Sequence, residues 1–191
     1  MKRPAEPLTR KEIWAIINAF STRTPTGIRN RALVMVLWRS GLRIKEALSL
    51  RVADIDFEEG SLRVLHGKGD KSRTAFIDRA PLEYVRTWID KRNELRIGPV
   101  HPLFCTLRGG PLDSSYVRHM LPRIAIKAGI VKRVHAHGLR HTHAAELRRE
   151  GVDIAAISKQ LGHSSISTTS RYLDHIAPAE VSKAIRGRRL K

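Results

Sequence analysis

The chain has 191 residues, of which 36 are Lys or Arg and 18 are Asp or Glu, so its formal net charge is +18. An excess of this size in a chain long enough for one domain favours a protein that binds a polyanion such as nucleic acid over the alternative of a small ribosomal or merely soluble protein. The lack of a long apolar run excludes a membrane span, and the single cysteine, Cys105, excludes an internal disulfide framework and predicts a cytoplasmic location.

Residues 9–50 predict three helices. Thr9 and Glu12 form a capping box, which starts a helix whose apolar residues recur with helical spacing. These apolar residues are Ile13, Ile16, Ile17 and Phe20. The stretch NRALVMVLWRSG is apolar enough for a central buried helix that ends at Gly41. RIKEALSL, residues 43–50, predicts a short helix directly after this glycine.

The spacing of apolar residues changes between positions 52 and 78. VADIDF, SLRVLH and SRTAFID each have the composition of a short strand, and EEG and GKGDK lie between them as turns. Because antiparallel strands can be joined by short turns, this segment predicts a three-stranded antiparallel meander.

Helical spacing returns after residue 80 and continues toward the C-terminus. Pro81 suits the first position of the next helix, and in the tail PAEVSKAIRG the apolar residues Val181 and Ile185 are four apart. The fold class is therefore mainly α with a small three-stranded antiparallel sheet (α+β), in a single domain over 1–191. The helices expected after the sheet cover 81–95, about 113–128, 138–151, 153–162 and the tail.

Cationic and imidazole side chains are concentrated in four stretches next to predicted turns, where functional groups are well displayed. A polar segment near the C-terminus, LGHSSISTTSRYLDH, carries Tyr172, one of three tyrosines in the chain. No acidic cluster suited to a metal ion accompanies these stretches. They are SGLRIKEALSL around Arg43, HGKGDKSR around Lys68, HAHGLRHTHAAEL around His137 and Arg140, and LGHSS around His163.

This set of side chains suits attack on a phosphodiester without a metal ion. The transition state carries negative charge on the non-bridging oxygens, and planar arginine side chains match these oxygens two at a time. A tyrosine hydroxyl, with an ordinary pKa of about 10, becomes a better nucleophile when positive charge favours its phenolate and an imidazole takes its proton. A lysine on a hairpin turn can protonate the departing sugar oxygen.

The chain resembles the catalytic domain of the tyrosine recombinases, the phage integrase and Xer family. The matching motifs are SGLRIKEALSL, the GKGDKSR turn, HGLRHTHA, LGHSS and RYLDH, in this order within residues 9–180. Their spacing agrees as well, because Arg140 follows His137 by three residues and precedes His163 by 23, and Tyr172 comes nine residues after His163. One such motif alone would be a weak sign, because GLR and LGH occur often by chance, so the resemblance depends on all five in order.

The resemblance implies a site-specific DNA recombinase that cleaves and rejoins strands through a covalent 3′-phosphotyrosyl intermediate, as in DNA integration. Tyr172 would be the nucleophile, and Lys68 would be the general acid toward the 5′ oxygen. Arg43 and Arg140 would clamp the scissile phosphate. The linkage keeps the energy of the broken diester, so no cofactor is expected.

Three further roles follow from the same resemblance. His163 would hydrogen-bond the scissile phosphate, and His137 would act near the tyrosine proton as a general base or a positioning group. Glu46, one helical turn beyond Arg43, matches the acidic supporting residue of the family and would orient the active site.

Other interpretations of the same residues stay open. In isolation, an arginine after a glycine, a turn lysine or a half-buried tyrosine more often has a structural role. Two other functions also fit similar motifs: a non-catalytic DNA-binding regulator on a recombinase fold, and a type IB topoisomerase or hairpin telomere resolvase. The full residue set argues against the regulator, and the spacing of the HxxR, LGH and Tyr motifs favours the recombinase over the topoisomerase.

The histidines around Arg140 also allow a zinc hypothesis. His137 and His141 are four residues apart on a predicted helix, with His135 and His143 nearby. Arg140 lies inside this cluster and would repel a dication, and no convincing carboxylate ligands accompany it. No metal is therefore predicted, and His141 is expected to be a hydrogen-bonded structural residue.

The expected domain organisation has a catalytic core over about 8–176 and a tail helix over 177–191. The tail would dock on a neighbouring protomer or fold back on its own domain. Family members usually carry an additional N-terminal core-binding domain, which is absent here, so a fragment and a naturally short member are both expected possibilities. Double-stranded DNA is the expected partner, with a monomer in solution and a homotetramer on DNA, while the target site and the recombination event have no readable pattern.

Overall fold

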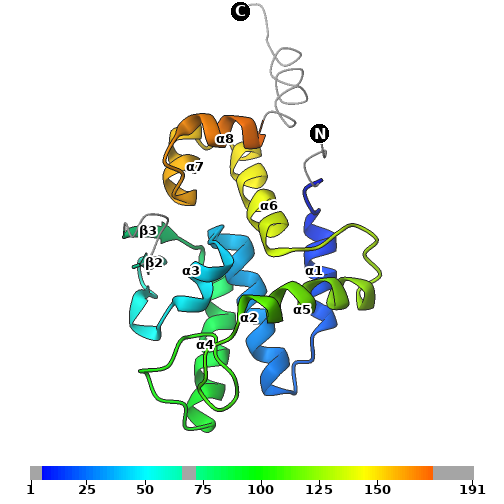
Figure 1. Ribbon diagram of the computed structural model, residues 1–191, viewed down its shortest axis with the longest axis vertical. Coiled ribbons are helices and arrows are strands. Elements are labelled where there is room, and N and C mark those ends of the chain that lie inside the picture. The colour runs from blue at the N-terminus through cyan, green and yellow to red at the C-terminus, as the bar shows by residue number, and fades with distance from the viewer. Residues whose placement is uncertain (1–5, 66–71, 174–191) are drawn as a thin grey trace, which may run out of the picture.

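The computed structural model describes residues 6–65 and 72–173, except for the side chains of 171–173. The predicted fold class is confirmed, because this part of the chain is mainly helical with one small antiparallel sheet (Figure 1). None of the described helices has both the length and the apolar character of a membrane span. The helices are α1 (Arg10–Ala19), α2 (Pro25–Ser40), α3 (Ile44–Ser49), α4 (Arg79–Glu94), α5 (Ser114–Lys127), α6 (Ala136–Arg149), α7 (Ile154–Leu161) and α8 (Ile166–Leu173).

Helix α2 is the central helix of the fold, and α4 and α6 pack against it (Figure 1). The Thr24 hydroxyl accepts a hydrogen bond from the Gly27 N–H at its start, and Pro25 occupies the first helical position. Its end is the predicted one, at Gly41, whose φ of 64° is left-handed and suits glycine. These start signals lie ahead of the apolar stretch that predicted the helix, so α2 begins earlier than the apolar pattern does.

The three strands form the predicted meander, in the order β1 (Ile55–Asp56), β2 (Ser61–Val64) and β3 (Arg73–Phe76). Leu62 pairs with Ile55 on one side and with Ala75 on the other. The first segment differs from the prediction, because it opens with a 3-10 turn over Val52–Asp54 before the short β1. The cause is the Asp54 carboxylate, which accepts a hydrogen bond of 2.9 Å from the Arg51 N–H and closes the turn.

Helices α6, α7 and α8 form a group at one end of the molecule (Figure 1). The predicted cap of α7 is confirmed, because the Asp153 carboxylate accepts a hydrogen bond from the Ala155 N–H. This helix ends at Gly162, and its last turns lie against β3. As a result, the end of α7 meets residues from α3, β3 and α6, which are far apart in the sequence.

Two further helix starts were also predicted slightly too late. Helix α4 begins at Arg79, so Pro81 is its third residue rather than its first, and α6 begins at Ala136 rather than Gly138. In both cases a few polar or small residues continue the helix beyond its apolar pattern. The expected tail helix lies outside the described residues, and the domain limits stay a prediction.

Candidate active site

The structure brings five of the predicted site residues together near the C-terminal end of α7. The two others are not described in the same detail: Lys68 lies outside the described residues, and Tyr172 is placed on α8 only by its backbone. Helices with well-defined ends therefore position most of the predicted set. Arg43 is the N-cap of α3, Glu46 lies on α3, His137 and Arg140 lie in the first turns of α6, and His163 follows Gly162 at the end of α7.

Two predicted arginines bind adjacent main-chain carbonyls at the end of α7. Arg43 Nη2 donates to the Gly162 carbonyl at 3.0 Å, and Arg140 Nη2 donates to the Leu161 carbonyl at 2.6 Å. The last carbonyls of a helix have no partner within the helix and carry the negative end of its dipole, so they attract guanidinium groups. The end of α7 thus holds the side chains of α3 and α6 side by side.

Arg140 is held by a second helix end as well. Its Nη1 donates to the carbonyl of Gly41, the residue that caps α2, at 2.6 Å. The residue is only 3% exposed. Because both of these acceptors are neutral carbonyls, they orient the guanidinium without neutralising its charge.

Glu46 lies between guanidinium groups and is itself 3% exposed. Its carboxylate accepts hydrogen bonds from the N–H and the Nη1 of Arg43, both at 2.7 Å. It also accepts one from Arg73 Nη2 at 3.0 Å. A buried carboxylate with several charge-assisted hydrogen bonds fixes the donors around it, so Glu46 has the contacts expected of an orienting residue.

Arg73 is the residue of this cluster that the sequence did not point out. It begins β3, where it reads as an ordinary alternating strand position, yet its Nη2 also donates to the Leu161 carbonyl at 3.3 Å. Its Nε and Nη1 are buried without a hydrogen-bond partner among the described residues. Desolvation lowers its pKa, Glu46 opposes this shift, and the charge of Arg43 adds to it. Among the described residues of this cluster, three guanidiniums face one carboxylate, which leaves an excess of positive charge.

The turn after α7 is shaped to accept Arg73. Gly162 has a φ of +64°, and a Cβ added there would lie 2.1 Å from Arg73 Nε. A glycine in the LGH motif therefore serves two purposes, a left-handed backbone and a close approach of the arginine. The turn places His163 directly beside the cluster.

Both predicted histidines are held neutral in this surrounding. Burial, followed by the charges of Arg140 and Arg43, lowers the pKa of His163 to about 4. Burial also lowers the pKa of His137, and Arg140 adds to the effect. A neutral imidazole can donate one hydrogen bond and accept another, which suits contact with a phosphate oxygen or with a tyrosine proton.

The histidines around Arg140 do not gather as a metal site in the described part of the chain, where no group of three His, Cys, Asp or Glu residues is placed to hold a metal ion. His135 and His137 have ring centroids 6.4 Å apart. His143 is 4% exposed and faces Gly41 instead, where a Cβ on the glycine would lie 2.6 Å from its ring.

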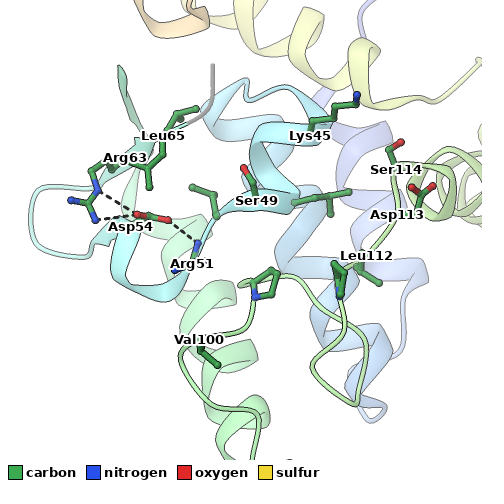
Figure 2. A pocket seen from close by; sticks show the side chains of 15 residues that line it. Lys45, Ser49, Arg51, Asp54, Arg63, Leu65, Val100, Leu112, Asp113 and Ser114 are labelled. Atoms are coloured by element: carbon green, nitrogen blue, oxygen red, sulfur yellow. Dashed lines mark hydrogen bonds and ion pairs between the residues drawn. The ribbon is translucent and has the colours of Figure 1, made fainter. Parts of the chain in front are cut away.

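A separate hollow of about 560 Å³ lies between α3, β2 and the loop before α5 (Figure 2). Lys45 and Ser49 of α3 line it, and Arg63 donates to the buried Asp54 carboxylate at its edge. It contains none of the predicted catalytic residues. The charged cluster at the end of α7, rather than this hollow, is the candidate active site.

The sequence matches the phage integrase family over residues 6–177, so the chain belongs to this family. Among curated relatives, the tyrosine recombinase XerD of Staphylococcus saprophyticus is 31% identical over 174 residues, which cover 90% of this chain and 58% of the relative. XerD of Staphylococcus aureus is 31% identical over 184 residues, covering 95% of this chain and 62% of the relative. The chain thus spans about three fifths of the length of these relatives.

Solved structures share this fold. A crystal structure of XerA recombinase has a TM-score of 0.83 and 32% identity, and the match covers 99% of this chain and 68% of the other. XerH recombinase, in a post-cleavage complex with palindromic difH substrate, has a TM-score of 0.79 and 29% identity over 96% of this chain and 53% of the other. The catalytic domain of bacteriophage HP1 integrase, 21% identical with a TM-score of 0.63, covers 97% of this chain and 96% of its own and supports the fold.

Proposed function

We propose that this chain is the catalytic part of a site-specific DNA recombinase, which cleaves and rejoins DNA strands through a covalent 3′-phosphotyrosyl intermediate. The observation that carries the proposal is the pair of guanidiniums on adjacent carbonyls, Arg43 on Gly162 and Arg140 on Leu161, beside His163. Helix α8, which carries Tyr172, follows this turn after three residues. A phosphodiester is the anion that such a set is suited to bind and to attack.

The proposed reaction begins with the scissile phosphate between Arg43, Arg140 and His163. The Tyr172 oxygen attacks the phosphorus as its proton passes to His137, and a P–O bond to tyrosine forms. The bond to the 5′ oxygen breaks, and Lys68 gives that oxygen a proton, which leaves a 5′-hydroxyl. Donors aimed at the charge of the transition state are each typically worth a factor of about 10² to 10³ in rate.

Rejoining is the same chemistry in reverse. A 5′-hydroxyl of another strand gives its proton to Lys68 and attacks the phosphotyrosine, and the tyrosine leaves as the proton on His137 returns to it. Because one diester replaces another, the step needs no external energy source. The guanidiniums supply the stabilising charge, so the proposal includes no metal ion and no organic cofactor.

Double-stranded DNA is the proposed partner. The net charge of +18 favours a polyanion, and the similar XerH protein is described in complex with its difH DNA substrate. We further propose that the chain is a monomer in solution and assembles as a homotetramer on DNA. Residues 177–191 would supply a contact between neighbouring protomers.

A covalent trap tests the proposal. The chain is incubated at low salt with a pool of duplexes that are nicked at a fixed position and randomised around the nick, so that the short strand with the 5′-hydroxyl diffuses away. The expected result is a protein–DNA adduct that survives denaturing electrophoresis with the wild type and is missing with Tyr172→Phe. Failure of the wild type to form an adduct with a pool that it binds, or an adduct with Tyr172→Phe, would overturn the proposal.

A further inference from the structure

Thr169 lies on α8 and contacts the ring of His163 from the side of the α7–α8 turn. Thr169 is completely buried, and its Oγ1 lies 2.8 Å from His163 Nδ1. We propose that Thr169 is a positioning residue, which fixes His163 as the tautomer with its proton on Nε2. This proposal rests on the proposed function, because it concerns the imidazole that would contact the scissile phosphate.

The direction of this hydrogen bond follows from the surroundings of the threonine. A hydroxyl can donate to Nδ1 or accept from it. Among the described residues, Thr169 Oγ1 makes its hydrogen bond with His163 Nδ1. If the ring donated, the hydroxyl proton would be buried without an acceptor, which is unfavourable. The threonine therefore donates, and Nδ1 is the acceptor.

The tautomer matters because the ring is uncharged. Four cationic or imidazole groups face His163 from three elements: His137 and Arg140 of α6, Arg43 at the start of α3, and Arg73 of β3. Together with burial they hold its pKa at about 4, so at neutral pH the ring has a single N–H. With Nδ1 accepting from Thr169, that N–H is Nε2–H, on the other side of the ring. Only this tautomer can donate from Nε2 to a phosphate oxygen.

The same contact connects two functional segments. Thr169 precedes Tyr172 by three residues on α8, so it lies about one helical turn before the proposed nucleophile. A single hydrogen bond therefore orients the imidazole and ties the start of the tyrosine helix to the turn that follows α7. The sequence offers a matched control, because the neighbouring Thr168 is exposed.

The first test is a spectroscopic one on the whole chain without DNA. With ¹⁵N-labelled histidine, long-range proton–nitrogen correlation spectra at neutral pH report which ring nitrogen carries the proton, and His163→Gln identifies the His163 signals. We expect Nδ1 to have the shift of an unprotonated acceptor in the wild type and in Thr169→Ser. In Thr169→Val we expect a shift toward mixed tautomers, while Thr168→Val leaves the signals unchanged. A protonated Nδ1 in the wild type would overturn the proposal without any variant.

The second test measures strand cleavage on a nicked duplex selected from the trap experiment. Hydrogen-bond partners that orient metal-binding histidines are worth about 10- to 100-fold in activity, and we expect a loss in this range for Thr169→Val. Thr169→Ser and Thr168→Val should cleave like the wild type. Equal cleavage by Thr169→Val would refute the positioning role. If neither the wild type nor any variant cleaves DNA, the proposed function fails, but the spectra still show which tautomer His163 adopts.

Discussion

Arginine is the most frequent residue type in the candidate site. The partners of these arginines explain how several positive charges can lie close together. Arg140 and Arg43 are bound by helix-end carbonyls, whereas Glu46 is the carboxylate that the described residues place among them. Carbonyl dipoles fix the geometry of a guanidinium but leave its charge available. A bound anion would therefore lower the repulsion inside the cluster, which is why we propose it as the phosphate site.

His143 destabilises the fold, and it has no role in the proposed reaction. Both of its ring nitrogens are buried without a hydrogen-bond partner among the described residues. Burial, with smaller contributions from Arg39 and Arg140, lowers its pKa to about 3. The unfolded chain binds a proton at this histidine below about pH 6.5, whereas the folded chain does so only near pH 3. The free energy of unfolding must therefore fall as the pH falls below about 6.5.

We expect His143→Phe to stabilise the fold and to weaken this pH dependence. Removing buried, unsatisfied nitrogens should raise the free energy of unfolding at pH 7 by about 1–3 kcal/mol. The larger phenylalanine ring has room, because His143 lines a hollow of about 560 Å³ beside β3 and α7. Between pH 7 and pH 5 the wild type should lose up to about 1.4 kcal/mol per pH unit more than the variant.

Urea denaturation across this pH range measures both effects. His119→Gln, which removes an exposed histidine, provides the matched control. Part of the dependence should persist in His143→Phe, because the pKa of His163 is also lowered, to about 4. A pH profile of His143→Phe that is parallel to that of the wild type would contradict the prediction.

At the scale of elements, the turn between α7 and α8 positions the residues of the candidate site. Gly162 ends α7 in a left-handed conformation, and its carbonyl accepts from Arg43. Its missing side chain leaves the space that Arg73 Nε occupies. One residue therefore contacts two of the guanidiniums and sets the direction of the chain toward α8.

Gly162→Ala should consequently be more damaging than the same substitution at an ordinary left-handed glycine. A left-handed alanine costs about 1–2 kcal/mol wherever it is placed. At Gly162 the methyl group would also displace Arg73, so we expect a larger loss of stability and at least about a tenfold loss of strand cleavage, as when a donor is misplaced.

Gly129→Ala is the matched control for this substitution. Gly129 has a similar φ of +71°, and nothing lies within 4 Å of an added Cβ. It should show the backbone cost alone, with cleavage unchanged. Thermal unfolding and the cleavage rate of both variants give the comparison, and equal effects at the two glycines would show that the close approach of Arg73 is unimportant.

The elements also show how far the sequence could lead. Signals that act over one helical turn were sufficient for Asp153 at the start of α7 and for Gly41 at the end of α2. Val52–Asp54 forms a 3-10 turn because the Asp54 carboxylate accepts a hydrogen bond from the Arg51 N–H. Such a local hydrogen bond from side chain to backbone competes with strand formation. Apolar spacing alone does not detect this competition.

The candidate site was predictable to the extent that its motifs are local. The contact between Arg73 and the Leu161 carbonyl joins residues 88 positions apart, and neither neighbourhood gives a sign of the other. Thr169 was likewise hidden, because a Ser- and Thr-rich segment looks uniform until burial separates it from the exposed Thr168. Tertiary packing, not residue type, selects these two residues.

At the scale of the whole molecule, charge should govern the proposed encounter with DNA. The chain has a net charge of +18 but spans only about three fifths of its curated relatives. Because of this excess of positive charge, most of its affinity for DNA should come from phosphate contacts. We therefore expect binding that decreases steeply as the salt concentration rises, by about 10³-fold between about 50 and 200 mM if about six phosphates are contacted.

The slope of log affinity against log salt concentration counts the phosphates that a protein neutralises, at about 0.9 for each. Arg43→Ala removes one proposed phosphate contact, so its slope should be shallower than that of the wild type by about one. Tyr172→Phe removes a neutral hydroxyl and should keep the wild-type slope even though it forms no covalent adduct. Fluorescence anisotropy titrations of one labelled duplex over a salt series give all three slopes. An unchanged slope for Arg43→Ala would place this guanidinium away from the DNA backbone, and tight, salt-insensitive binding by the wild type would contradict a mainly electrostatic interface.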